Sequence, residues 1–547
     1  MFVHPRKFVI EDRIMKSEKV IFEVGNADLG KFFLETLKSK PTFVGQIDAV
    51  TGEESTYRRM EDESVRCALW LRKNGLKPGD IVFTCTSNAL YSCIPVLATF
   101  YNGAAHIFGH KSMHIEIVRR YLVDHIKPKF IFTEQEKIEM FLKIVSEEKL
   151  DTKIVVFTKV SGLDSLNEIL SQSESEEIDN FCCIPPSNPD ENCLFCLSSG
   201  TTGDPKLIVH SYKQIMEALQ TCIRNQRKEN ADEIISMIYP PMHWALSLKV
   251  NLINILMFAR RIIVQDTCSD LQQVFQMIEK FKVTDVRFSI LMMYRMYGWK
   301  ELLKFDTSSL KTIFYNGIKF EPRIIKFLMQ LANNVKLMQT YGATEMATPM
   351  FGGIMNNIDL DSCGSMWPNM EMKIIDVQTG DTLNPGEKGE ICFKSPGLMK
   401  GYSHNLKATE EAIDSEGWYH TGDFGYYEES GLGYILGRIR NTIMVQINGN
   451  VVPLWKVERA LATFSDIIEC LILSDLEIGD YSQIFAFVAL MGGSKVTEEE
   501  LNEIVNKFDE IAIPITVKIL DELPRTSVGK IDLKELKKIA KLSIHKI

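Results

Sequence analysis

The sequence lacks the features that mark several specialised classes of protein. Only 12 of its 547 residues are cysteine, far too few for a disulfide scaffold. Its 62 lysine and arginine residues are outnumbered by 72 aspartate and glutamate residues, which gives a net charge of −10. Binding to a nucleic-acid backbone needs a basic surface, so this balance argues against a nucleic-acid partner. It leaves room for a local pocket that holds a phosphate group.

No apolar run reaches the roughly 18–20 residues that a membrane-spanning helix needs. Met1 to Arg13 lack the apolar core of a signal peptide, and Ser543 to Ile547 differ from the peroxisomal S-K-L address. We therefore expect no transmembrane segment, and a cytoplasmic rather than a peroxisomal location. The CxxC of Cys193 and Cys196 stands alone in an apolar stretch, which favours a buried strand over a zinc or redox site.

Composition and local pattern indicate a globular α/β protein, with 45% hydrophobic and 24% charged residues. Short apolar strands such as Ile81–Cys85 and Phe130–Thr133 alternate with helical segments. Two of these helices are expected over Tyr57–Asn74, which ends before Gly75, and over Asn88–Tyr101. Such alternation predicts βαβ units on parallel sheets, and therefore a large N-terminal domain built from layered subdomains.

The pattern changes in the last fifth of the chain. Strand-like segments at Ile467–Leu473 and Ile484–Leu490 are accompanied by helical segments at Glu498–Phe508 and Leu533–Leu542. This combination predicts a second, small C-terminal α+β domain with a core of its own.

The strongest chemical signal is the segment Leu197–Lys206, with the sequence LSSGTTGDPK. An apolar strand runs into a loop with two glycines, four hydroxyl residues and one lysine. Glycine lets backbone N–H groups approach an anion, hydroxyl groups donate further hydrogen bonds, and lysine adds a positive charge. The spacing differs from that of the Walker P-loop. The loop therefore indicates polyphosphate binding, with a plain glycine–serine hairpin turn as the structural alternative.

Further motifs follow in order along the chain: Gln339–Glu345 (QTYGATE), Gly386–Ile391, Gly401–Tyr402, Trp418–Asp423 (WYHTGD), Gly437–Arg440 (GRIR) and Leu523–Lys530 (LPRTSVGK). With the phosphate loop, this series resembles the motifs of the adenylate-forming superfamily. That superfamily contains acyl-CoA synthetases, 4-coumarate-CoA ligase-like enzymes, beetle luciferases and peptide-synthetase adenylation domains. The resemblance extends over nearly the whole chain.

The resemblance implies an architecture and a reaction. It implies a large AMP-binding domain over residues 1–437, a hinge at 438–440 and a small C-terminal domain over 441–547 that rotates about the hinge. A fatty or aryl carboxylic acid would attack the α-phosphorus of ATP, giving an acyl-AMP and pyrophosphate. The acyl group would then pass to coenzyme A. ATP, Mg²⁺ and coenzyme A are the cofactors expected, and a small-molecule carboxylic acid is the expected partner.

The resemblance also implies which residues surround the nucleotide. Tyr341, next to Gly342, would stack on adenine, since an aromatic face suits a base. Thr344 would contact the α-phosphate, and Glu345 would hold Mg²⁺, which prefers oxygen ligands. The adenine-lining turn would be formed by Asn316, Gly317 and Ile318, and the phosphate loop would contribute Ser198, Ser199, Gly200, Thr201, Thr202, Gly203 and Lys206.

Three charged residues complete the implied site. Asp423 would accept hydrogen bonds from both ribose hydroxyls, a role that needs an ionised carboxylate. Arg438 would contact ribose or phosphate, while Arg440 would lie at the pivot of the hinge. Lys530 would be the catalytic lysine, a permanent cation that bridges the attacking carboxylate and the α-phosphate.

The implied acid site contains one unexpected residue. His243 matches a position near the substrate carboxylate and the pantetheine channel, and the residues that follow it would line the acyl pocket. Lys249 is foreign to an apolar pocket. It would either pair with a polar substrate or point outward, and the sequence leaves both possibilities open. The family spacing also lengthens between Arg438 and Gly449, beside a loop that would line the thiol channel.

Two other functions share these motifs. A luciferase-type monooxygenase would use the same adenylation residues and then react the adenylate with O₂. A catalytically silent relative would bind a nucleotide or ligand without turnover. The presence of Thr344, Glu345, Asp423 and Lys530 together favours an active enzyme. The motifs are the same for different acids, and for thioester formation and oxygenation of the adenylate. They carry no information about the oligomeric state.

Overall fold

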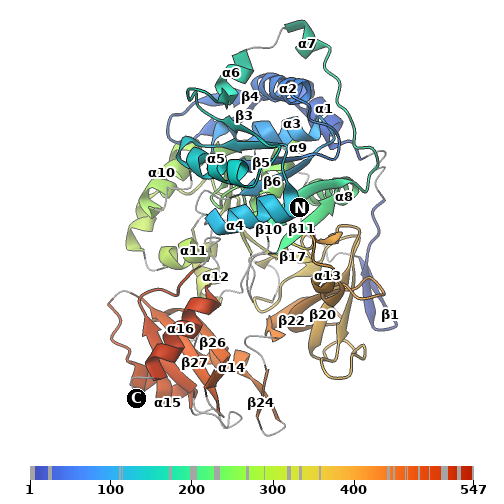
Figure 1. The fold of residues 1–547 in the computed structure, drawn as a ribbon. Helices are drawn as coiled ribbons and strands as arrows, with labels where there is room; N and C mark the ends of the chain where they lie inside the picture. Colours follow the sequence, from blue (N-terminus) through green and yellow to red (C-terminus); the bar gives the residue numbers. More distant parts are fainter. Residues whose placement is uncertain are drawn as a thin grey trace.

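The structure is a computed structural model of the whole chain (Figure 1). The residues that it describes are 7–21, 27–109, 113, 115–171, 175–197, 206–226, 234–265, 270–288, 290–297, 299–316, 322–331, 335–355, 359–439, 444–447, 450–461, 464, 466–478, 481–491, 493–506, 515–525 and 531–544. They form a large mixed α/β N-terminal domain and a small C-terminal domain, as the sequence predicts.

Two large sheets form the centre of the N-terminal domain. In spatial order, the first contains β21 (Gly401–Tyr402), β11 (Leu207–Ser211), β10 (Asn192–Leu197), β6 (Ala105–Gly109), β5 (Ile81–Cys85), β7 (Phe130–Thr133), β8 (Lys153–Val156) and β9 (Asp164–Ser165). The second contains β18 (Ser365–Met366), β17 (Phe351–Ile354), β16 (Lys336–Tyr341), β15 (Thr312–Asn316), β14 (Asp285–Arg287), β12 (Ile235–Ile238), β13 (Arg260–Ile263), β3 (Val44–Asp48) and β4 (Glu54–Thr56). The first is parallel from β10 to β9 and the second from β16 to β3, so the predicted βαβ organisation is confirmed.

Helices lie on both faces of these sheets and create three apolar cores. One core lies between the two sheets and includes α1 (Leu29–Ser39), α2 (Tyr57–Lys73), α3 (Ile94–Phe100), α8 (Tyr212–Gln226) and α9 (Ala245–Leu256). The outer face of the first sheet is covered by α4 (Ile115–Arg120) and α5 (Ile138–Glu147). The outer face of the second is covered by α10 (Leu271–Phe281), α11 (Ile290–Tyr297) and α12 (Pro322–Met329). The shorter α6 (Leu166–Ser171), α7 (Ser175–Asp179) and α13 (Leu406–Ala412) lie in connections.

The helix predictions differ from the structure in one instructive place. Helix α2 begins where the Thr56 hydroxyl accepts a hydrogen bond from the Arg59 N–H, and it ends before Gly75, which has a φ of +89°. The helix expected over Asn88–Tyr101 starts later, because Leu90–Cys93 forms a 3₁₀ turn and α3 begins at Ile94. Pro95, in the first turn of α3, has no N–H group and suits a helix start.

A third sheet is antiparallel throughout, and the alternation of strands and helices does not predict it. Its order is β1 (Phe8–Glu11), β2 (Ile14–Ser17), β19 (Glu371–Ile375), β20 (Gly389–Lys394), β22 (Tyr419–Tyr427) and β23 (Gly433–Arg438). The N-terminal hairpin thus pairs with strands more than 350 residues later in the sequence. This sheet carries the T-G-D motif and ends at Arg438, so it positions residues predicted to bind the nucleotide.

The small C-terminal domain has two apolar cores of its own. It contains β24 (Met444–Ile447), β25 (Asn450–Pro453), β26 (Ile467–Ile478), β27 (Tyr481–Leu490), β28 (Ile515–Leu520), α14 (Leu454–Leu461), α15 (Glu498–Val505) and α16 (Leu533–Ile544). It lies beside α12 of the large domain (Figure 1). The Arg323 guanidinium donates to the Ile467 carbonyl at 2.8 Å, Arg295 pairs with Glu522 at 2.9 Å, and Ile468 packs on the core under α10–α12.

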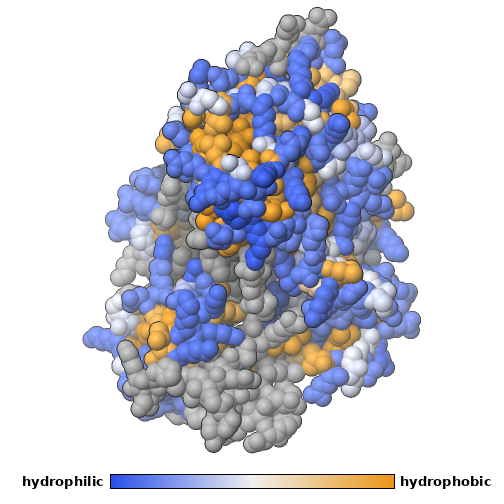
Figure 2. Space-filling view, viewed as in Figure 1, coloured by the Kyte–Doolittle hydropathy of each residue, from blue (hydrophilic) through white to orange (hydrophobic). Residues whose placement is uncertain are grey.

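Two further predictions concern membrane-spanning helices and the cysteines of the CxxC motif. Hydrophilic residues cover most of the face in Figure 2, and apolar residues appear in separate groups. None of the helices within the described ranges is long and apolar enough to span a bilayer. Cys193 and Cys196 are both buried in β10, which confirms the prediction of a buried strand.

Candidate active site

The predicted adenine residues lie at the carboxyl ends of two neighbouring parallel strands. Asn316 ends β15 and Tyr341 ends β16, and Asn316 pairs in register with Thr340. Ligands of α/β proteins commonly bind at this edge of a parallel sheet. Gly317 and Ile318, the other predicted residues of this turn, lie outside the described residues. Gly342 follows Tyr341 directly, so the motif QTYGATE begins in β16 and continues beyond the end of the strand.

Asp423 is the centre of a cluster that joins two sheets. Its carboxylate is 7% exposed and accepts a 2.5 Å hydrogen bond from the Tyr341 hydroxyl. Its other oxygen lies 2.9 Å from Nε of Arg438, the residue opposite Asp423 in the pairing of β22 with β23. Arg438 also donates from Nη1 to the Thr421 carbonyl at 2.9 Å. The structure therefore brings together three residues that the sequence assigned to adenine, ribose and phosphate.

The ionisation of this cluster follows from its burial. Burial, and then the nearby Asp423 charge, raises the pKa of Tyr341 well above its ordinary value, so Tyr341 remains a phenol that donates a hydrogen bond. The neighbouring Tyr419 also has a raised pKa, again chiefly through burial. With one phenol donor and one guanidinium donor beside it, the Asp423 carboxylate is an acceptor held in a fixed orientation.

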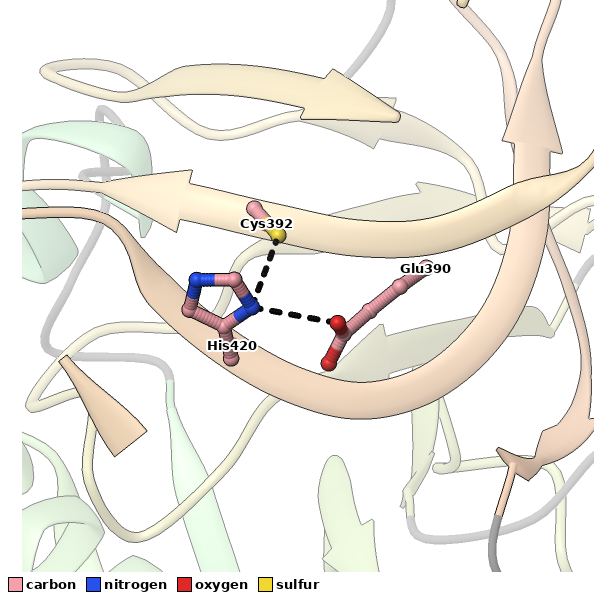
Figure 3. A group of neighbouring side chains, drawn as sticks. All are labelled: Glu390, Cys392 and His420. Atoms are coloured by element: carbon pink, nitrogen blue, oxygen red, sulfur yellow. Dashed lines mark hydrogen bonds and ion pairs between the residues drawn. The ribbon is translucent and has the colours of Figure 1, made fainter. Parts of the chain in front are cut away.

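Strand β20 supports the turn that presents Asp423, through Glu390. Figure 3 shows Glu390 and Cys392 beside His420. Gly422 has a φ of +68°, a conformation that favours glycine, and its N–H donates to Oε1 of Glu390 at 2.9 Å. The other Glu390 oxygen lies 3.1 Å from Nδ1 of His420, whose Nε2 faces Asp414 at 3.5 Å. His420 thus lies between two carboxylates, and one of them also holds the turn before Asp423.

Glu390, Cys392 and His420 offer one oxygen, one sulfur and one nitrogen atom within 4.8 Å of one another. A metal would require a thiolate and an unprotonated imidazole. In the structure, Nδ1 of His420 already lies 3.1 Å from Oε2 of Glu390 and 3.7 Å from Sγ of Cys392, and the hydrogen bond with Glu390 raises the pKa of His420. We therefore interpret the group as a hydrogen-bonded support for the T-G-D turn.

This support predicts a pH-dependent stability. Because the pKa of folded His420 is raised, its stabilising contribution is complete below the unfolded pKa of about 6.5 and is lost as pH rises through the folded pKa. We expect His420→Gln to lower the melting temperature most at about pH 6 and progressively less toward about pH 8.5. Thermal unfolding of both proteins across this range measures the difference. The exposed His404→Gln is the control, and a pH-independent difference for His420→Gln would contradict the assignment.

Glu345 and Lys206 converge on one aromatic residue. The Tyr402 hydroxyl donates to Oε1 of Glu345 at 2.8 Å, and the Lys206 ammonium lies 4.6 Å from the centre of the same ring. Burial, followed by the Glu345 charge, raises the pKa of Tyr402, which keeps its proton available for this bond. Because the hydroxyl occupies one carboxylate oxygen, Glu345 has its second oxygen for a hard cation. The donor type fits Mg²⁺.

The segment after β16 is fixed from below by His210. Its Nε2 lies 3.0 Å from the Thr344 carbonyl, which can only accept, so Nε2 carries the proton. His210 is 1% exposed, and burial lowers its pKa to about 3, so the ring is neutral. Through this contact His210 supports the segment that carries Thr344. His243 lies half-buried just before α9, with its ring centre 6.5 Å from that of Trp244.

The strands on either side of the phosphate loop form an antiparallel pair, with Leu197 opposite Leu207. Lys206, just before β11, is described. The other predicted loop residues, Ser198, Ser199, Gly200, Thr201, Thr202 and Gly203, lie outside the described residues, as do Arg440, Gly449 and the predicted catalytic residue Lys530. Their assigned roles stay predictions.

Sequence reasoning assigned no role to Glu390, Tyr402 or His420, although all three lie in motifs that it noted. Their places in these motifs were the only signal that the sequence offered. Their partners come from other segments, so the contacts themselves are visible only in the fold.

The chain is similar to known proteins over most of its length. The family model described as AMP-binding enzyme matches residues 35–403, and that of the AMP-binding enzyme C-terminal domain matches residues 456–530. A luciferin 4-monooxygenase of Luciola mingrelica is 27% identical over 509 residues, covering 90% of this chain and 91% of the relative. A 4-coumarate–CoA ligase 3 of Oryza sativa subsp. japonica is 26% identical over 500 residues, covering 90% and 88%. The crystal structure of ATP-bound MatB from Rhodopseudomonas palustris superposes with a TM-score of 0.82 at 19% identity, over 94% of this chain and 99% of that one.

Proposed function

Because the chain belongs to the AMP-binding enzyme family of adenylate-forming proteins, we propose that it activates a fatty or aryl carboxylic acid with ATP and transfers the acyl group to coenzyme A. The observation that carries the proposal is the cluster of Tyr341, Asp423 and Arg438. It places a buried carboxylate beside the end of a parallel sheet, where a nucleoside can use it. The similarity to a 4-coumarate–CoA ligase supports coenzyme A as the acceptor.

In the proposed first step, the carboxylate of the acid attacks the α-phosphorus of ATP. The P–O bond to the β-phosphate breaks, pyrophosphate leaves, and acyl-AMP remains. Tyr341 and Asp423 hold the adenosine, Thr344 faces the α-phosphate, and Lys206 with the loop before it receives the pyrophosphate. Lys530 stabilises the charge at the α-phosphate. This chemistry needs positioning and electrostatic stabilisation and no protein acid or base.

In the proposed second step, the small domain rotates about residues 438–440. Lys530 then leaves the site, and the loop that lines the thiol channel takes its place. The coenzyme A thiol then attacks the acyl carbonyl, and AMP leaves. The domain bounds of 1–437 and 441–547 belong to this proposal. Arg438 supports it, because it is bonded to Asp423 and lies at the start of the predicted hinge. Motions of this kind separate the two steps in time.

Glu345 is the proposed ligand for Mg²⁺. When bound, the ion would supply positive charge that neutralises the phosphates. The Tyr402 hydroxyl orients the half-buried carboxylate, and no described Lys or Arg forms an ion pair with it within 4.0 Å, so an oxygen of Glu345 remains for an ion.

The second candidate is a luciferase-type monooxygenase, which the 27% identity to a luciferin 4-monooxygenase favours. The two functions share the adenylation residues and differ in whether a thiol or O₂ attacks the adenylate. A third possibility is a relative that binds nucleotide without turnover.

The test is an ATP–pyrophosphate exchange assay on the full-length protein across fatty and aryl acids. We expect acid-dependent exchange, and thioester formation when coenzyme A is added. Light emission measured in the same reactions, with and without coenzyme A, identifies the monooxygenase. Exchange with none of the acids, together with measurable ATP binding, would refute the ligase and favour the binding protein.

A further inference from the structure

Lys249 is a cation inside the large domain, close to the proposed reacting centre. It belongs to α9, which packs between α8 and strands β12 and β13. Its neighbours on the helix, Leu248 and Val250, are buried. Its ammonium points inward, toward the segment that follows β16. The alternative that Lys249 points outward is therefore excluded.

The ammonium is held by two backbone carbonyls and by no carboxylate. Its Nζ donates to the Ala347 carbonyl at 3.0 Å and to the Met346 carbonyl at 3.4 Å. Among the residues that the structure describes, no Asp or Glu oxygen lies within 4.0 Å of it. An ammonium has three N–H donors, so one remains after these two bonds. Met346 and Ala347 follow Glu345 directly, which places this donor beside the segment proposed to face the α-phosphate and Mg²⁺.

A buried charge without a counter-ion is unfavourable. Burial lowers the pKa of Lys249, which reflects the free energy needed to keep the charged form there. Two neutral carbonyl acceptors compensate part of that free energy. If this position only had to be filled, methionine or leucine would occupy a similar volume without the free energy of burying a charge. The Glu345 charge acts on Lys249 but forms no ion pair with it within 4.0 Å, so a charged residue is explained if a ligand oxygen contacts the ammonium directly.

Two other buried polar groups of this region also have atoms without a hydrogen-bond partner in the described part of the chain. His210 is 1% exposed; its Nδ1 has a lone pair with no hydrogen-bond partner in the described part of the chain. The Lys249 charge contributes to lowering the pKa of His210, which places the two groups near each other. The Thr348 hydroxyl, next to Ala347 and 5% exposed, likewise lacks a partner among the described residues. Buried polar groups normally have partners, so these atoms point to a polar ligand.

We propose that Lys249 determines substrate specificity by binding a second oxygen group of the acid, a carboxylate or a carbonyl, while the first carboxylate reacts with ATP. The substrate class is then an acid that carries an additional hydrogen-bond acceptor, and unsubstituted hydrocarbon acids are poor substrates. This inference rests on the proposed acid activation and adds the chemical class of the acid.

The experiment uses matched sets of acids of equal length: the plain monocarboxylic acid, the dicarboxylic acid and the oxo acids. Acid-dependent pyrophosphate release gives kcat/KM for each. For the wild type we expect at least one acceptor-bearing acid to exceed its plain counterpart about tenfold or more, since a site built around a polar group rejects analogues that lack it. If the dicarboxylic acid has the highest kcat/KM, the partner of Lys249 is a carboxylate. If an oxo acid has the highest kcat/KM, the partner is a carbonyl group.

Two variants then connect the preference to Lys249. Lys249→Met keeps the length and removes the charge, and we expect it to erase the preference because KM for the acceptor-bearing acid rises far more than KM for the plain acid. Lys249→Arg keeps a cation and should retain part of the preference. Binding of ATP, followed by thermal shift, verifies that both variants fold.

Three outcomes would overturn the inference. If the wild type prefers plain acids, the inference about Lys249 is wrong and the proposed function still stands. This result is obtained on the wild-type protein alone, so it does not depend on the folding of a variant. A preference that survives in Lys249→Met assigns the recognition to other residues. Exchange with no acid at all removes the proposed function and this inference together.

Discussion

Replacement of Lys530 by alanine is expected to lower the rate of acyl-AMP formation on the order of 10²- to 10³-fold, the effect of removing one preorganised group that stabilises transition-state charge. The thioester step, started from preformed acyl-AMP and coenzyme A, should keep most of its rate, because Lys530 is proposed to leave the site before that step. ATP–pyrophosphate exchange measures the first reaction, and thioester formation from synthetic acyl-AMP measures the second.

The difference between the two reactions is what tests the role of Lys530. Lys534 lies on the exposed face of α16, so Lys534→Ala is a matched control that should leave both steps unchanged. Lys530→Arg keeps the positive charge on a different side-chain shape and should show a smaller loss. Equal losses of both steps in Lys530→Ala would mean that the residue acts on folding or on a shared ligand rather than on adenylation alone.

Asp423→Ala is expected to give the second large loss, through nucleotide binding. Hydrogen bonds to a charged group are worth about 1.5–3 kcal/mol each, and Asp423 is proposed to accept two from the ribose. The variant should therefore raise KM for ATP on the order of 10²- to 10⁴-fold. It also removes the partner of both Arg438 and the Tyr341 hydroxyl, so a further loss in kcat is expected. Initial rates of pyrophosphate exchange against ATP concentration measure both parameters.

Folding must be separated from binding in this variant, because Asp423 is buried. Asp423→Asn keeps the shape and removes the charge, and it should show most of the increase in KM with a melting temperature closer to that of the wild type. The exposed Asp381→Asn is the control for removing an acidic residue from the same domain. A KM for ATP in Asp423→Asn equal to that of the wild type would exclude the ribose role.

The fold divides into parts that local sequence encodes and parts that it does not. The parallel sheets were predictable, because strands such as β5 and β7 are apolar runs and helices such as α2 begin at a capping residue and end before a glycine. The antiparallel sheet was not, because β1 and β2 pair with β19 across some 350 residues. Short strands of this kind carry no local mark of their partner.

The candidate site divides in the same way. The residues of the motifs, such as Tyr341 and Asp423, were found through the resemblance to the adenylate-forming superfamily, and their residue types suit the binding of a nucleotide. Their mutual hydrogen bond was not foreseeable, since it joins the end of one sheet to a turn of another. The direction of Lys249 was also open until its carbonyl partners, almost 100 residues away, were located.

The contacts between the two domains have a consequence for their relative motion. The Arg295–Glu522 pair is solvent-exposed, and pairs of this kind contribute about 0–1 kcal/mol. The other described contacts are the Arg323–Ile467 hydrogen bond and the packing of Ile468 on the core under α10–α12, while the small domain keeps two apolar cores of its own. The proposed rotation of the small domain would break these few contacts and leave the cores of both domains closed. Substitutions along this boundary are therefore expected to change how long the small domain spends in each orientation, and with it the rate of the proposed two-step reaction.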